Sequence, residues 1–217
     1  SNPVKRRGES PFFYSFPTDL LPMFSRLSRY RELLICIALT LLAQGLMPYL
    51  PLEYQRTAII NGQIWRLISG GWLHHNLPHM AMNLLALLLI WENLPSRLTP
   101  YWRPYLLALL VLCVDIGIWL WVPTTEYYWG LSGALHGLFA FGAWCWLPAR
   151  PRLTILWLVG LAIKLCWDHW RTDDTTAALI GTAVHTPSHL IGSGAGIALG
   201  LLWWYWQRRA PHYSADK

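Results

Sequence analysis

The chain has 217 residues, of which 54% are hydrophobic and 13% are charged, and it has a formal net charge of +6. A water-soluble domain usually contains about twice this fraction of charged residues, so the composition argues against one. The positive residues fall between apolar runs and form no patch, which argues against nucleic-acid binding. The 15 tryptophans favour a membrane protein, because tryptophan collects at membrane–water interfaces.

The apolar runs predict six membrane-spanning helices, and therefore an all-α integral membrane fold built as a six-helix bundle. A spanning helix needs about 20 largely apolar residues, and some of these runs are short for that length. The predicted spans are residues 33–50, 79–94, 104–122, 131–147, 153–167 and 187–206. They divide the chain into a basic N-terminal segment (1–31), a six-helix domain (32–207) and a tail (208–217).

The lysine and arginine residues predict the orientation of these spans, because cytoplasmic flanks are enriched in positive charge. Most of the 17 Lys and Arg residues precede the first span or lie in the second-to-third connection, the fourth-to-fifth connection and the tail. Both termini are therefore expected in the cytoplasm. The loops at 51–78, around Glu126 and at 168–186 are expected on the outer side, with the polar 168–186 loop as a lid.

Polar side chains occur in the first turns of the second, fourth and sixth predicted spans. These three spans all begin at the outer face, so the polar groups are expected at similar depth. Polar groups inside a membrane are costly and are candidates for function. The residues concerned are His79, Asn83, Ser132, His136 and His189.

Ser132 stands between two glycines, Gly130 and Gly133, at the start of the fourth predicted span. One interpretation is that Ser132 only caps the helix. Small residues continue after it at helical spacing, and they permit another helix to approach closely. The sixth span has a matching surface, because Gly192 and Gly196 form a GxxxG face.

His189 lies one turn before this glycine face. If the two small faces pack, His189 comes next to Ser132. A neighbouring imidazole can take the proton whose loss makes a serine hydroxyl a good nucleophile. A histidine that only caps a helix or lies at the interface is the alternative. The shared depth and the complementary faces favour Ser132 and His189 as a catalytic pair.

Acyl transfer also needs hydrogen-bond donors for the developing oxyanion. His79 and Asn83 are four residues apart on one helical face and can supply them. The alternative is two polar residues that face a wet cavity. A metal site built from His74, His75 and His79 is disfavoured, because the spacing is not HExxH and no glutamate follows. We expect no metal and no cofactor.

These motifs, in their order and spacing, resemble the rhomboid intramembrane serine proteases over about residues 65–200. Each motif alone is weak, whereas the ordered set is specific. The motifs are Trp65-Arg66, His74, His79-x-x-x-Asn83, Gly130-x-Ser132-Gly133 and His189-x-x-Gly192-x-x-x-Gly196.

The resemblance implies a six-helix fold with a Ser–His dyad that requires no third acid. It implies that Ser132 is the nucleophile and that His189 is the general base and acid. It also implies an oxyanion hole formed by His79, Asn83 and the backbone N–H of Ser132.

The other motif residues receive supporting roles from the same resemblance. Trp65 and Arg66 would belong to a structured outer loop that leans into the membrane. His74 would hold that loop by hydrogen bonds.

One departure from the family pattern is informative. Many rhomboids have a tyrosine four residues after the serine, which stacks on the catalytic histidine, and this chain has His136 there. In this respect it resembles the rhombosortase branch, whose implied substrates are exported proteins with a C-terminal Gly-Gly motif, a membrane span and a basic tail. His136 either orients His189 or is a packed polar residue.

The resemblance further implies a multi-pass protein of the bacterial inner membrane, with its active site open to the periplasm. Its partners would be membrane-anchored substrates and the lipid bilayer. Two other functions are compatible with the sequence. A rhomboid-like protein could bind membrane spans without cutting them, but such a protein would be expected to lack the serine or the histidine. A small transporter would be expected to show internal repeats.

Hydrolysis needs water, so we expect Ser132 in a cavity that opens outward. The preceding aromatic residues at 127–129 predict an interfacial belt, which places Ser132 roughly one or two helical turns deep. Asp115 and Lys164 are predicted at similar depth in the third and fifth spans. They are expected either to pair or to leave Lys164 extending outward, and neither is expected to be catalytic.

Overall fold

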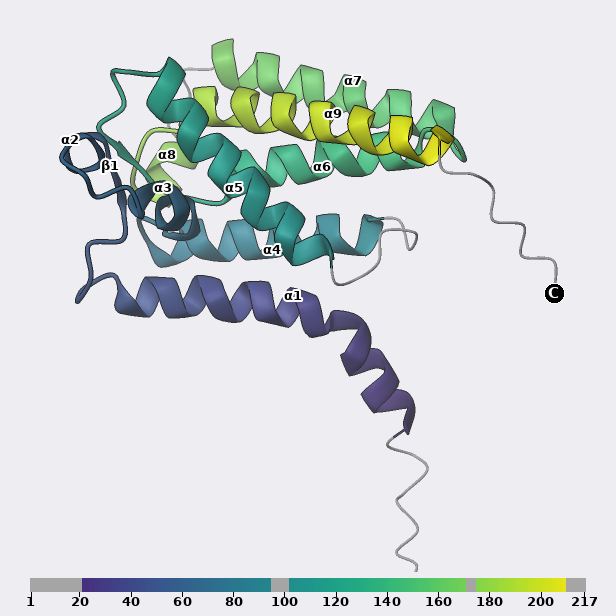
Figure 1. Cartoon of the computed structure of the whole chain (residues 1–217), viewed down its shortest axis with the longest axis horizontal. Helices are drawn as coiled ribbons and strands as arrows, with labels where there is room; N and C mark the ends of the chain where they lie inside the picture. The colour runs from purple at the N-terminus through teal and green to yellow at the C-terminus, as the bar shows by residue number, and fades with distance from the viewer. Residues whose placement is uncertain (1–20, 95–101, 171–174, 210–217) are drawn as a thin grey trace, which may run out of the picture. The chain divides into compact units, whose positions relative to one another are not determined.

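The computed structural model describes residues 21–94, 102–170 and 175–209 (Figure 1). Within these ranges the chain is almost entirely helical, which confirms the all-α prediction. Six long helices coincide with the six predicted spans. They are α1 (Leu21–Leu46), α4 (Leu77–Asn93), α5 (Trp102–Trp121), α6 (Ser132–Trp146), α7 (Pro151–Trp170) and α9 (Thr186–Arg209).

The chain divides into two units, Ser1–Arg31 and Glu32–Lys217. In the first unit the described residues, from 21 onward, form the beginning of α1. Residues 1–20 of the predicted basic segment and residues 210–217 of the predicted tail lie outside the described residues. The remaining helices and the candidate site belong to the second unit.

Short elements connect the long helices of the second unit. Between α1 and α4 lie β1 (Tyr54–Gln55), α2 (Arg56–Ile60), α3 (Arg66–Ser69) and η2 (Gly70–Trp72); β2 (Tyr127–Tyr128) precedes α6, and α8 (Thr175–Ile180) precedes α9. β1 pairs antiparallel with β2, with Tyr54 opposite Tyr128. The pairing joins the long first connection to the segment that leads into Ser132.

Two of the described helices, α5 and α7, are long and apolar enough to cross a membrane by length and composition. The long helices also present large apolar side chains on their surfaces. Examples of such exposed residues are Leu39 and Leu42 on α1, Leu85 and Leu89 on α4, and Ile163 on α7. Extended apolar surface is uncommon on water-soluble monomers, so these surfaces suit lipid. Membrane crossing by all six helices, and their orientation, stay predictions.

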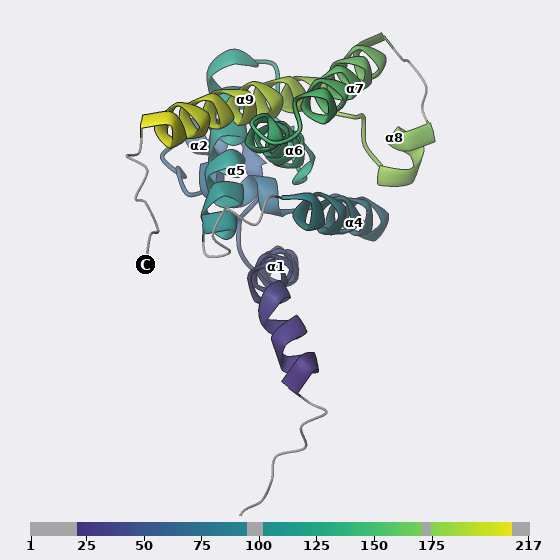
Figure 2. The ribbon, with the colours of Figure 1, turned by 90° about the vertical axis from the view of Figure 1, so that its right-hand side faces the viewer.

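Helix α6 lies in the middle of α4, α5, α7 and α9, all of which it contacts (Figures 1 and 2). Most of its residues are buried, and many of the buried ones are glycine or alanine. Small side chains allow neighbouring helices to approach closely. The composition of α6 therefore explains why a helix of only 15 residues can occupy the centre.

The closest of these contacts is between α6 and α9. A Cβ atom added at Gly192 would lie 1.9 Å from the carbonyl oxygen of Gly133, and one added at Gly196 would lie 2.0 Å from that of Gly137. Backbone therefore touches backbone, and no side chain fits between the two helices at these positions. The structure brings together the two glycine faces that the sequence indicated.

Replacing Gly196 with valine should destabilise the protein, because the added atoms must push α9 away from α6. Overpacking of this kind costs about 1–3 kcal/mol, and more when backbone must move. The matched control is Gly194→Val on the same helix, since Gly194 has no atom within 4 Å of an added Cβ. Thermal unfolding in detergent should show a lower Tm for Gly196→Val alone. Equal Tm values for the two variants would contradict the proposed contact.

Candidate active site

Ser132 is the first residue of α6, and its hydroxyl faces α9. The Oγ atom of Ser132 lies 3.0 Å from Nε2 of His189, which is in the first turn of α9. The residue in the N-cap position is Leu131, and no side chain caps the helix. The interpretation of Ser132 as a simple helix cap is therefore wrong. The serine and the histidine are already within hydrogen-bond distance, as a nucleophile and its base require.

The other ring nitrogen of His189 also has a partner. Nδ1 of His189 lies 3.1 Å from Oδ2 of Asp168, and both side chains are largely shielded from solvent. Asp168 also forms an ion pair with Lys164, one turn earlier on α7. Sequence reasoning missed this acid, because it assigned Asp168 to the 168–186 loop. In the structure α7 continues to Trp170, so Asp168 is helical.

Asp115 and Lys164 do not pair, so the first of the two alternatives for these residues is wrong. The Lys164 amine contacts Asp168 instead. Oδ2 of Asp115 accepts a hydrogen bond from the backbone N–H of Gly71 at 3.0 Å. Asp115 thus anchors η2 to α5. The i,i+4 spacing of Lys164 and Asp168 was the signal in the sequence that could have identified the observed pair.

The ring of His136 packs face to face with the ring of His189. The rings of His136 and His189 are stacked, with centroids 4.1 Å apart and an interplanar angle of 15°. Nδ1 of His136 lies 2.7 Å from the carbonyl oxygen of Ser132. A carbonyl can only accept, so this nitrogen holds a proton and the bond fixes the ring. Of the two interpretations of His136, the contact favours the one in which it orients His189.

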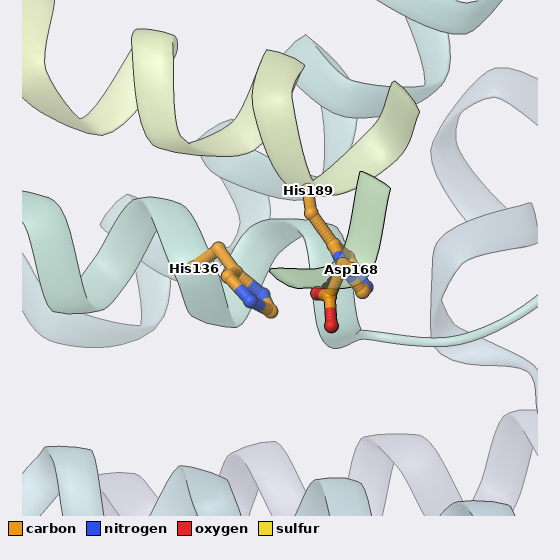
Figure 3. Close-up of side chains that lie close together, drawn as sticks. All are labelled: His136, Asp168 and His189. Carbon is orange, nitrogen blue, oxygen red and sulfur yellow. Dashed lines mark hydrogen bonds and ion pairs between the residues drawn. The ribbon is translucent and has the colours of Figure 1, made fainter. Parts of the chain in front are cut away.

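Three potential metal ligands lie close together (Figure 3): His136, Asp168 and His189. Their nitrogen and oxygen atoms that could bind a metal lie within 4.8 Å of one another. A zinc ion would lie in the plane of each imidazole that binds it, about 2.0–2.1 Å from the nitrogen. The two rings are nearly parallel and 4.1 Å apart, so one ion cannot lie in both planes at that distance. The arrangement suits proton transfer better than metal binding.

Two polar side chains of α4, His79 and Asn83, line the same cavity as Ser132. Nδ1 of His79 and Nδ2 of Asn83 are buried and have no hydrogen-bond partner among the described residues. A Cβ atom at Gly130 would lie 2.7 Å from Nε2 of His79 and 3.4 Å from Nδ2 of Asn83. Gly130 also has φ of 110°, a conformation that favours glycine. Because Gly130 has no side chain, its backbone can lie directly against the His79 ring.

The first connection is structured, as the family resemblance implied. Arg66 is buried, with Nη1 donating to the carbonyl oxygen of Glu53 at 2.7 Å and forming an ion pair with its carboxylate. Nε1 of Trp65 donates to the carbonyl oxygen of Pro51 at 3.1 Å. Both residues thus stabilise the segment between α1 and α4. Its insertion into the membrane stays a prediction.

His74 contributes to this segment through its backbone. Its N–H donates to Oε1 of Gln44 at 2.8 Å, and its carbonyl accepts from Nε2 of Gln44 at 3.1 Å. The His74 ring packs edge-on against the His79 ring, with centroids 5.1 Å apart. Burial, with the nearby His79 adding to it, lowers the pKa of His74 to about 3. A neutral His74 ring therefore packs against the His79 ring.

A cavity of about 760 Å³ surrounds these groups. The starts of α4, α6 and α9 line it through His79, Asn83, Ser132 and His189. Residues 182–185 and part of α8 also line it, so the connection between α7 and α9 borders the site. Its role as a lid stays a prediction. Residues 171–174 of that connection lie outside the described residues. The direction in which the cavity opens stays a prediction.

Comparison with known proteins gives two matches. Residues 61–206 match the family model of the Rhomboid domain. The chain is also 28% identical over 151 residues to "Rhomboid protease GlpG" of Serratia proteamaculans (strain 568). That alignment covers 68% of this chain and 49% of the relative, so the chain spans about half the length of the curated relative that it matches.

His185 connects the cavity wall to the start of α9. Its Nδ1 accepts from the backbone N–H of Ser188 at 3.2 Å, so its Nε2 is the protonated nitrogen and donates to Oγ1 of Thr125 at 2.9 Å. Burial, and then the proximity of His189, lower the pKa of His185 to about 4. The neutral ring thus holds together two segments that border the site.

This lowered pKa predicts a dependence of stability on pH. The unfolded chain binds a proton at His185 near pH 6.5, whereas the folded protein does so only near pH 4. The contribution of His185 to stability is therefore fully present above about pH 6.5 and is lost as the pH falls toward 4. Thermal unfolding between pH 7 and pH 4 should show a smaller decrease in Tm for His185→Gln than for the wild type. The same decrease in both proteins would contradict this assignment.

Proposed function

This chain belongs to the rhomboid family of membrane proteins, and on that basis we propose that it is an intramembrane serine protease. The observation that supports the proposal most directly is the 3.0 Å contact between Oγ of Ser132 and Nε2 of His189. The contact lies at the wall of a cavity of about 760 Å³. A protein that only bound membrane spans would not need this pairing.

The proposed reaction begins when Oγ of Ser132 attacks the carbonyl carbon of the scissile bond. His189 takes the hydroxyl proton at Nε2 as the new C–O bond forms. His189 then gives this proton to the departing amine as the C–N bond breaks, which leaves an acyl-enzyme. A second nucleophile, water in a hydrolytic cycle, releases the acyl group in the same way.

The negative charge that develops on the carbonyl oxygen needs donors that are already in place. We assign this role to His79, to Asn83 and to the backbone N–H of Ser132. The first N–H groups of a helix have no partner within that helix, and Ser132 is the first residue of α6. The unpartnered Asn83 amide supports the same assignment. The close approach of the His79 ring to Gly130, two residues before Ser132, supports it as well.

The shape of the surface supports a substrate with an apolar helix. A second cavity of about 280 Å³ extends from Ser132 and His136 along α6, between α4 and α7. Further along, a third cavity of about 160 Å³ has mostly apolar walls that include Leu138, Phe139 and Trp157. Together they form an apolar groove that begins at the nucleophile. Such a groove fits a membrane span of a substrate.

The position of Ser132 supports cleavage inside the membrane. Fifteen residues of α6 extend only about 22 Å at 1.5 Å per residue, against about 30 Å for the hydrocarbon core of a bilayer. With the C-terminal end of α6 at the cytoplasmic surface, Ser132 lies below the outer surface. The positive flanks favour cytoplasmic termini, which leaves the site open to the opposite side of the membrane. The family resemblance makes a bacterial inner membrane, with the site open to the periplasm, the proposed location.

Within this function we further propose substrates like those of the rhombosortase branch: exported proteins with a C-terminal Gly-Gly motif, a membrane span and a basic tail. The support is His136, which stacks on His189 where many rhomboids have a tyrosine. The membrane-anchored substrate and the lipid bilayer are the proposed partners.

A fluorophosphonate probe, which reacts with activated serines, tests the catalytic pair. The purified wild type should react, and Ser132→Ala and His189→Ala should each remain folded but unreactive. Cleavage of a fusion protein with a Gly-Gly motif, an apolar span and a basic tail should be lost in both. The double variant should be no worse than either single one, because the pair acts as a unit.

The matched control for Ser132→Ala is Ser193→Ala. Ser193 is a buried serine on α9 whose hydroxyl has no hydrogen-bond partner among the described residues. This variant should react like the wild type. Substantial labelling or cleavage by Ser132→Ala would end the protease proposal and leave the non-cleaving binding protein as the better explanation.

The oxyanion assignment predicts a different kinetic effect. His79→Ala and Asn83→Ala should each lower kcat by about 10²–10³-fold, with little change in KM. The matched control is Leu85→Ala on the same helix, because the Leu85 side chain is exposed and lines none of these cavities. It should leave kcat within about threefold of the wild type. Normal turnover in both site variants would place the oxyanion donors elsewhere.

A further inference from the structure

Asp168 is in the last turn of α7, and its side chain lies beside the ring of His189 (Figure 3). Oδ2 of Asp168 lies 3.1 Å from Nδ1 of His189, and Nε2 of the same ring lies 3.0 Å from Oγ of Ser132. The side chains of His189 and Asp168 are only 6% and 11% exposed. Carboxylate, imidazole and hydroxyl therefore form one continuous hydrogen-bonded chain.

Two further contacts hold Asp168 in this position. The Lys164 amine binds its carboxylate from the preceding turn, and Oγ1 of Thr186 donates to its backbone carbonyl at 3.4 Å. Thr186 is the first residue of α9 and precedes His189 by less than one turn. The end of α7 and the start of α9 are thus joined on both sides of the histidine.

We propose that Asp168 is a positioning residue for His189, which makes the site a Ser–His–Asp arrangement and not a dyad. The inference rests on the proposed protease function and adds to it a residue on a third helix. Asp168 does not touch the reacting atoms. It acts only through the imidazole of His189.

The chemistry follows from which nitrogen of His189 holds the proton. An ionised carboxylate can only accept hydrogen bonds, so Asp168 keeps the single proton of a neutral His189 on Nδ1. The lone pair of Nε2 then faces the hydroxyl of Ser132, as a general base requires. When His189 takes the serine proton, the negative carboxylate stabilises the imidazolium. Asp168 itself stays ionised, and the proton passes to the departing amine.

A purely structural ion pair would explain these contacts less well. The Lys164 side chain is 51% exposed, and exposed ion pairs contribute only about 0–1 kcal/mol. The contact of Asp168 with His189 is more shielded, and it is directed at the ring nitrogen opposite the serine. Lys164 therefore orients the carboxylate, and the stronger effect of Asp168 falls on His189.

The test compares four variants of the full-length protein in detergent. For each variant, kcat and KM are measured separately on the Gly-Gly fusion substrate. The rate of fluorophosphonate labelling is measured in parallel. In Asp168→Asn the amide can donate to Nδ1 and favour the unproductive tautomer, so kcat should fall by roughly 10²–10⁴-fold with KM little changed. Asp168→Glu keeps the carboxylate and should recover at least about tenfold of that loss.

Two further variants distinguish a positioning role of Asp168 from a purely structural one. Lys164→Met removes the ion pair between Lys164 and Asp168 but leaves the hydrogen bond between Asp168 and His189. Its kcat should therefore fall by less than about tenfold. His169→Asn changes the exposed neighbour of Asp168 on the same turn and should match the wild type. Equal losses of kcat in Asp168→Asn and Lys164→Met would overturn the inference, as would wild-type kcat in Asp168→Asn.

A measurement on the unmodified enzyme keeps the inference testable even where a variant fails to fold. Imidazole ¹⁵N chemical shifts of His189 should show the proton on Nδ1 in the resting enzyme, and a proton on Nε2 would overturn the inference. The same assays distinguish failure of the proposed protease function from failure of this inference. A wild type that neither reacts with the probe nor cleaves the substrate would refute both proposals, whereas an active wild type with an equally active Asp168→Asn refutes only this one.

Discussion

The site depends on the contact between the glycine faces of α6 and α9. Ser132 and His189 are 57 residues apart in the chain and belong to different helices, so only the packing of those helices can bring them together. Helix axes usually lie 8–10 Å apart because side chains separate them. Here the carbonyl of Gly133 occupies the position that a Cβ at Gly192 would need. Since Gly133 directly follows Ser132, the closest point of contact is also next to the nucleophile.

The opposite wall of the site is held by the segments outside the long helices. The hydroxyl of Tyr128 donates to the carbonyl oxygen of Gly130 at 2.8 Å, and this bond fixes the turn that lies against His79 and Asn83. Tyr128 is itself in β2, which pairs with β1 of the first connection. Arg56, directly after β1, donates to the carbonyl oxygen of Trp119 at the end of α5 at 2.8 Å. The position of the proposed oxyanion donors thus depends on residues far from them in the chain.

Sequence reasoning succeeded where a local pattern determines the structure. Apolar runs predicted the long helices, and glycines at helical spacing predicted which faces meet, so the pairing of Ser132 with His189 could be inferred. Asp168 was missed because the apolar run ends at residue 167, and a polar residue after such a run reads as loop. The extra turn of α7 that directs it at His189 is stabilised by contacts with α9, which no local pattern records. Similar depth alone suggested Asp115 as a partner for Lys164, but depth does not say which way a helix faces.

Some polar groups of the site have hydrogen-bond partners in the resting protein and others do not. This difference matters for the proposed reaction. His189 has partners at both ring nitrogens, and His136 is fixed by the carbonyl of Ser132. The amide of Asn83 is buried without a partner among the described residues. An unpaired buried donor costs about 1–3 kcal/mol, and the tight packing of α6 must offset that cost in the resting protein. In the proposed reaction the cost is recovered when a negative oxygen forms beside the amide, so the same unsatisfied group favours the transition state over the ground state.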